Sequence, residues 1–148
     1  MASVTYGQCY IKSTDANSDH ITYYIDPELV AQTAEMGIAF SVQMIGENYY
    51  LAITYQFADK AVPLEEKVGI ELKNGYTLEL EMYTMQVANA SGVELTLAVF
   101  NLRPEHMEYF TKSELEAVHF STMEGKKNKL SVTTNNGMLM RQLKCFGK

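Results

Sequence analysis

The chain has 148 residues, of which 47% are hydrophobic and 20% charged, with a formal net charge of −6 at pH 7. This is the size of one ordinary domain that buries its own core and needs neither disulfides nor metals, so we expect a single globular domain over residues 1–148. The acidic balance argues against a nucleic-acid partner, which needs a dense basic face, and no apolar run approaches the roughly 20 residues of a membrane span.

The first elements predicted are a hairpin and a helix. Residues 6–13 and 20–25 have strand character on either side of a polar turn. Asp26 can then cap a helix, Pro27 suits its first position and Glu28 meets the positive end of its dipole. We therefore predict one short helix from this point to Gly37.

Two alternating apolar sets follow, over residues 38–44 and 49–57. Matching their inward faces requires an even loop, formed either by residues 47–48 alone or by residues 45–48. Gly46 can adopt a positive φ and favours the longer loop.

The clearest pattern is a hairpin over residues 68–82, where period-two alternation continues on both sides of Asn74-Gly75. A two-residue loop would place apolar and charged residues on one face. A three-residue loop with Gly75 in a left-handed conformation instead pairs Leu72 with Tyr76 and keeps the faces matched. It also places Lys67 opposite Glu81.

The second half of the chain continues as short elements. They are a loop at 87–92, a strand from 93 that ends at Arg103-Pro104, a short edge strand at 105–110, a capping box at 111–114 that opens a helix over 114–118, and strands at 118–123 and 129–134. Residues 136–146 fit either the last strand of a hairpin or a helix stopped by Gly147, and their apolar spacing favours the helix.

These elements predict an α+β fold that is predominantly antiparallel β. We expect a sandwich or a curved, barrel-like sheet of about eight or nine strands, with one to three short helices.

Three segments occur in the same order as in a known group of proteins. They are residues 46–51 (GENYYL), 72–75 (LKNG) and 110–115 (FTKSEL). Over roughly residues 38–135 the chain resembles small β-rich proteins of unknown function from gut Bacteroidetes. The resemblance implies a bacterial β-rich domain. Those relatives often carry secretion signals, and they contribute no catalytic or ligand residue.

The N-terminus and the cysteines bear on localisation. Residues 1–5 lack a charged and an apolar signal region, which predicts a cytoplasmic protein if Met1 is the native start. A periplasmic or secreted location is the alternative if a signal segment has been removed. Cys9 and Cys145 match no disulfide framework or metal motif, which favours two reduced, buried thiols. In an oxidising compartment they could instead form a bridge across almost the whole chain.

Few residues carry the marks of catalysis. Glu71, Glu79 and Glu81 share the outward face of the central hairpin, and carboxylates about 5–9 Å apart hydrolyse glycosides. Acidic residues on the wet face of a sheet are the plainer interpretation. The histidines (His20, His106 and His119) are isolated, and no nucleophile or phosphate-loop signature occurs. We therefore expect neither a metal nor a cofactor.

Three tyrosines remain as candidate binding residues. The alternation places Tyr24, Tyr50 and Tyr83 on outward faces, where rings can stack on a sugar or anchor a protein interface. The alternative is that they stabilise the strands or are covered by a neighbouring element.

Together these features favour a non-catalytic binding or interaction module whose unknown ligand is a protein or a glycan. A homodimer is a possible further property, formed through an exposed sheet edge or through the outward tyrosines. The alternative is a small hydrolase that acts on glycans through Glu71, Glu79 and Glu81.

Overall fold

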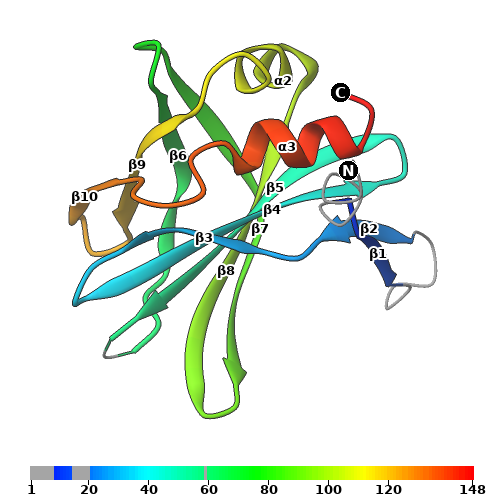
Figure 1. Cartoon of the computed structure of the whole chain (residues 1–148). Coiled ribbons are helices and arrows are strands. Elements are labelled where there is room, and N and C mark those ends of the chain that lie inside the picture. The colour runs from blue at the N-terminus through cyan, green and yellow to red at the C-terminus, as the bar shows by residue number, and fades with distance from the viewer. Residues whose placement is uncertain (1–8, 15–20, 59) are drawn as a thin grey trace.

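The computed structural model describes residues 9–14, 21–58 and 60–148 (Figure 1). In these ranges the chain forms ten strands and two helices. In chain order they are β1 (Ile11–Thr14), β2 (Thr22–Ile25), β3 (Glu28–Gln32), β4 (Met36–Ile45), β5 (Asn48–Phe57), β6 (Leu64–Leu72), β7 (Thr77–Ala90), β8 (Val93–Leu102), α2 (Pro104–Phe110), β9 (Leu115–Thr122), β10 (Lys127–Ser131) and α3 (Met138–Cys145).

The strands of the described residues join one open sheet in the order β1-β2-β4-β5-β8-β7-β6-β9-β10, with β3 paired to β4 alongside β2. The long strand β7 pairs with β6 over its first half and with β8 over its second half. Figure 1 shows the sheet curling round the core, with α3 lying across it. The predicted fold class is confirmed, as an open curved sheet rather than a closed barrel. The strand order ends at β1 and β10, and a homodimer through a sheet edge stays a prediction.

The core follows the alternation predicted for the central strands. Inward side chains from neighbouring strands are almost fully buried. They include Ile38, Phe40 and Val42 of β4, Leu51, Ile53 and Tyr55 of β5, and Val68, Ile70 and Leu72 of β6. Burial of such side chains is the main stabilising contribution to the sheet, at about 25 cal/mol per Å² of apolar surface.

The central hairpin has the predicted register. Ile70 lies opposite Leu78, and the Leu72 N–H donates to the Tyr76 carbonyl at 2.8 Å. Gly75 has a φ of +98°, the left-handed conformation that the three-residue loop requires. The three-residue loop predicted from the alternation of the two strands is therefore confirmed.

The β4–β5 hairpin has the register of the longer predicted loop, with Met44 opposite Tyr49. Pairing continues one step further, between Ile45 and Asn48, so the turn itself is the two residues 46–47. Gly46 adopts a φ of +62°, as the prediction assumed.

The helix predicted between Asp26 and Gly37 is wrong, because this segment contains strand β3. Val30 and Ala31 are fully buried, and the strand pairs antiparallel with β4. Pro27 precedes the strand at the corner after β2, where the missing N–H is tolerated. Pairing with β4 outweighs the local capping signals, which contribute only weakly to stability.

The edge strand predicted at 105–110 and the helix predicted at 114–118 are also wrong. The first segment forms helix α2, and the second belongs to strand β9. Met107 and Phe110, three residues apart, are buried on one face of α2. Thr111 caps the end of this helix, since its N–H donates to the Met107 carbonyl at 3.0 Å and its hydroxyl to the Glu108 carbonyl at 3.0 Å. The supposed capping box therefore marks a helix end.

The loop predicted at residues 87–92 is also wrong, because β7 continues to Ala90 and the turn is confined to Ser91 and Gly92. Both turn residues have positive φ, +55° and +83°. Asn89 stabilises the turn by accepting the Gly92 N–H at 3.0 Å, and is thus part of the hairpin end.

The last segment forms helix α3, the alternative that the sequence favoured, and Gly147 follows it with a φ of +84°. Met138, Leu139 and Leu143 bury one side of the helix in the core. Gln142 is fully buried as well and reaches the backbone of β4.

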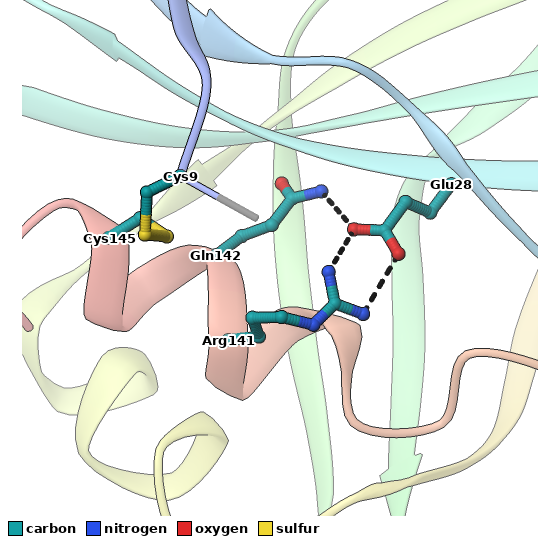
Figure 2. The surroundings of a disulfide bond; sticks show 5 residues. All are labelled: Cys9, Glu28, Arg141, Gln142 and Cys145. Carbon is teal, nitrogen blue, oxygen red and sulfur yellow. Dashed lines mark hydrogen bonds and ion pairs between the residues drawn. A yellow bond between two sulfur atoms is a disulfide. The ribbon is translucent and has the colours of Figure 1, made fainter. Parts of the chain in front are cut away.

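Gln142 completes the sheet where β2 gives way to β3. Beside β4, β2 pairs only with residues 43–45 and β3 only with residues 37–40. In the gap between them, the Val42 N–H donates to Gln142 Oε1 at 2.8 Å. Gln142 Nε2 donates to the Asp26 carbonyl at 3.4 Å and to Glu28 Oε2 at 2.8 Å, and the second of these bonds is drawn in Figure 2. A side-chain amide thus replaces a missing strand residue.

A two-pronged ion pair holds α3 to β3. Arg141 donates from both terminal nitrogens to the two Glu28 oxygens, at 2.7 and 2.9 Å (Figure 2). Burial acts to raise the pKa of Glu28, but the bonds from Arg141 and Gln142 together hold that pKa below its ordinary value.

Gln142→Leu is expected to lower the free energy of unfolding by about 1–3 kcal/mol, because the Val42 N–H and the Asp26 carbonyl lose their partner. Urea denaturation measures the change. Gln56→Leu is the matched control, since Gln56 is exposed on β5 and should change stability little. Equal stabilities of the two variants would contradict the role assigned to Gln142.

The Glu28–Arg141 pair is expected to make the free energy of unfolding depend on pH in the acidic range. The folded pKa of Glu28 lies below the unfolded one, so its contribution is complete above the ordinary glutamate pKa of about 4.3 and is lost as the pH falls through the folded value. The stability difference between wild type and Glu28→Gln should therefore shrink between about pH 5 and pH 3. A difference that stays constant over this range would argue against the assignment.

Candidate functional site

The three tyrosines predicted to point outward lie close to one row across the sheet. Tyr24 of β2 lies opposite Gln43 of β4, Gln43 opposite Tyr50 of β5, and Tyr50 opposite Asn101 of β8. Residues directly opposite in antiparallel strands point to the same side. The register therefore gathers side chains that are far apart in sequence.

Tyr83 joins this row through an irregularity in β7. The register with β8 shifts by one residue between Met82 and Thr84, so Tyr83 is the extra residue of a bulge. Its ring lies 4.9 Å from that of Tyr50, at an angle of 39°. Tyr83 is 58% exposed while Tyr50 is only 7% exposed. Tyr50 is thus the buried member of the pair and Tyr83 the exposed one. Burial, with a smaller contribution from Tyr83, raises the pKa of Tyr50.

A cleft of about 440 Å³ opens beside Tyr50, between the β4–β5 turn, the end of β8 and the start of α2. Its lining combines aromatic rings with amides and charged groups. Among the lining residues are Asn48, Tyr49, Tyr50, Asn101, Arg103 and Lys148. This mixture of flat rings and convergent polar groups is typical of small-ligand sites.

Arg103 is fixed on one wall of the cleft. Its guanidinium donates to Glu81 Oε1 at 3.1 Å, and its backbone N–H donates to His106 Nδ1 at 3.1 Å in the first turn of α2. Asn101 Nδ2 donates to the Glu81 carbonyl at 3.3 Å. Burial lowers the pKa of His106 despite the opposing effect of the Glu105 charge, which favours the neutral ring that accepts this bond.

Another wall of the cleft comes from Lys148, which follows the end of α3. The Phe146 ring meets the Tyr49 ring edge-on at 5.8 Å, and Lys148 Nζ lies 5.0 Å from the centre of the Tyr49 ring. The position of this wall depends on how firmly the end of α3 is held.

A disulfide holds that end. Cys9 and Cys145 are bonded, across a sequence separation of 136 residues (Figure 2). This corrects the preference for two reduced thiols. The sequence gives no spacing signal for the bond, because β2, β4 and α3 together bring the two ends of the chain side by side.

The three glutamates on the central hairpin are engaged in separate ion pairs. Glu79 lies 3.4 Å from Lys67 and Glu81 lies 3.1 Å from Arg103. Lys67 is opposite Glu81 in the register, as predicted, but its ion pair is with Glu79.

Glu71 receives the closest contact of the three. His119 Nε2 lies 2.8 Å from its carboxylate, and Lys129 Nζ lies 3.8 Å away. The hydrogen bond with His119 lowers the pKa of Glu71, with a smaller contribution from Lys129. A lowered pKa keeps the carboxylate ionised, whereas a general acid requires a raised pKa.

No group of three or more metal-binding side chains is found among the described residues, and His20 lies outside them. In the same part of the chain, no helix is both long and apolar enough to cross a membrane.

Comparison with protein-family models, with characterised proteins and with solved structures finds no match to this chain. The resemblance to small β-rich Bacteroidetes proteins therefore stays a prediction.

Sequence reasoning found the tyrosines but missed the polar residues beside them. The alternation gives Gln43 the same outward face as Tyr24 and Tyr50. Asn101 could not be added, because β5 and β8 are separated by β6 and β7 in the chain and their register has no local signal.

Loss of the disulfide is expected to lower the free energy of unfolding by about 4–5 kcal/mol, because the unfolded chain regains the freedom that a very long closed loop removes. Urea denaturation with and without dithiothreitol measures the effect. A Cys9→Ser, Cys145→Ser double variant is the control and should not respond to the reductant. A wild-type transition that also fails to respond would contradict a stabilising bond.

Proposed function

We propose that this protein is a non-catalytic binding module that takes a carbohydrate at the cleft beside the Tyr50–Tyr83 pair. The observation that carries the proposal is this pair of tilted rings in contact, one exposed and one buried, beside a cleft of about 440 Å³ that is lined by amide and guanidinium groups.

A sugar ring matches both parts of this surface. Its C–H face is apolar and flat enough to lie on an aromatic ring, and its hydroxyl groups both donate and accept hydrogen bonds. Tyr83 provides an exposed ring. Asn48 and Asn101 each have a donor and an acceptor in one planar group, and Arg103 adds N–H donors. The Glu81 ion pair limits the motion of Arg103 before a ligand arrives.

The polar groups also favour a glycan over a protein ligand. A protein interface of standard size buries about 800 Å² on each partner, usually around fully desolvated apolar anchors. Here Tyr50 lines a small cleft together with amides and charged groups, and Tyr83 lies against Tyr50.

The alternative function, glycan hydrolysis through outward glutamates, receives less support. Glu71, Glu79 and Glu81 each lie within 4.0 Å of a basic side chain. The lowered pKa of Glu71 makes this carboxyl a poor proton donor near neutral pH.

We further propose that the protein works in an oxidising compartment, as a periplasmic or secreted protein. The Cys9–Cys145 bond supports this location, because disulfides persist there and are reduced in the cytoplasm.

A glycan array followed by calorimetric titration of the oligosaccharides that bind tests the function. Tyr83→Ala is expected to weaken binding about tenfold, which corresponds to about 1.4 kcal/mol and is within the range for one stacked ring.

Tyr23→Ala is the matched control. Tyr23 is also an exposed tyrosine, but it neighbours Tyr24 on β2 and so points to the opposite face of the sheet. It should leave binding unchanged, and thermal melting verifies that both variants are folded. Absence of any bound oligosaccharide, or an equal effect of the two substitutions, would refute the proposed site.

A further inference from the structure

A second pair of tyrosines has nearly the same geometry as the first. The rings of Tyr76 and Tyr109 lie 4.9 Å apart at an angle of 57°. Both remain exposed, at 54% and 37%. They border a cleft of about 280 Å³ whose lining also includes Asn74, Glu108 and Lys112. As at the first cleft, a pair of tyrosine rings lies beside an amide, but here both rings are exposed.

The second pair is held in place by the chain around it. The Tyr76 N–H donates to Asn74 Oδ1 at 3.2 Å, and the Asn74 N–H donates to Ser113 Oγ at 3.1 Å. Lys73 and Glu114 add an ion pair at 3.3 Å between the same two segments. The tip of the β6–β7 hairpin is therefore tied to the segment that follows α2, which fixes Tyr76 relative to Tyr109.

The two clefts border the same short helix, and Met107 of the first cleft directly precedes Glu108 of the second. Pro104, at the start of α2, lines the first cleft, and Tyr109, near its end, lines the second. Figure 1 shows α2 between the tip of the β6–β7 hairpin and the β4–β5 turn. The seven residues of α2 span about 10 Å, and the seven residue steps from Tyr76, just before β7, to Tyr83 span at most about 23 Å. Tyr76 follows the inward alternation of Leu78 and Leu80, whereas Tyr83 follows the outward alternation of Glu79 and Glu81. One oligosaccharide that meets both ring pairs therefore passes over the end of the sheet beside α2.

The exposed face of α2 between the clefts carries two glutamates, whereas the cations Arg103, Lys148 and Lys112 line the clefts themselves. Glu105 and Glu108 are exposed on α2, and the whole chain has a net charge of −6. An anionic glycan laid across this helix would meet like charges, whereas hydroxyl groups of a neutral chain can donate hydrogen bonds to carboxylates.

We propose that Tyr76 and Tyr109 form a second subsite for the same ligand, so that the protein binds a neutral oligosaccharide long enough to cross α2. This inference rests on the proposed function, because it assumes that the Tyr50–Tyr83 cleft takes the other end of the chain. Two linked contacts then act on one ligand, and affinity rises once the chain is long enough to reach both.

The test is a length series. Neutral gluco-, xylo- and manno-oligosaccharides, from disaccharide to decasaccharide, are titrated against the full chain by calorimetry. Wild type is expected to gain at least tenfold in affinity when the chain reaches the spanning length. Tyr76→Ala should abolish this gain and leave short chains unaffected, and Tyr76→Phe, which keeps the ring, should retain it. Tyr83→Ala should weaken binding at every length.

The outcomes separate the two proposals. If Tyr76→Ala binds long chains like wild type while Tyr83→Ala remains weakened, the second subsite is wrong and the first cleft stands. If Tyr83→Ala matches wild type at every length, or no oligosaccharide binds, the proposed function fails and the second subsite with it. Tighter binding of polygalacturonate oligomers than of neutral chains of equal length would overturn the neutral class of ligand.

Discussion

The amide of Gln142 is the contact on which the arrangement of the first half of the chain depends. Where β2 ends and β3 begins, the edge of β4 has no strand beside it, and a buried peptide N–H without a partner is costly. Gln142 has the same donor and acceptor groups as a peptide and fills this gap from helix α3. The Glu28–Arg141 pair and the Cys9–Cys145 bond then fix the same helix to β3 and to the N-terminal segment. Three contacts of different chemistry thus hold one short helix against the sheet.

This arrangement has a direct consequence for the candidate site. The end of α3 presents Phe146 and Lys148 to Tyr49, and so forms one wall of the first cleft. The other wall, at Arg103, belongs to the start of α2 and is tied to β7 through Glu81. A binding surface built from short segments is only as well ordered as the contacts that support it. Here the supports are a disulfide, an ion pair and buried hydrogen bonds, which is consistent with a site formed before the ligand binds.

Much of the fold could be predicted because its strands are joined by short turns. Alternation defines the faces of each strand, and parity across a turn then allows only a few registers, as at Gly75 and Gly46. The errors share one cause. Helix signals at Asp26-Pro27 and at Thr111–Glu114 are local preferences of about one kcal/mol or less, and pairing with β4, β6 and β10 buries whole strands. The same alternation predicted which tyrosines point outward, but it did not predict the polar residues beside them, such as Asn101.

The sequence by itself therefore determined the inward and outward faces, the two central hairpins and the final helix, because these depend on residues close together in the chain. Only the tertiary structure decided that β5 lies beside β8, that Cys9 meets Cys145, and that Gln142 replaces a strand residue. It also decided that Tyr50 and Tyr83 become neighbours, through a bulge that the local sequence pattern does not predict. Contacts between distant segments are set by the way the whole sheet curls around its core, and no short stretch of sequence specifies that curvature.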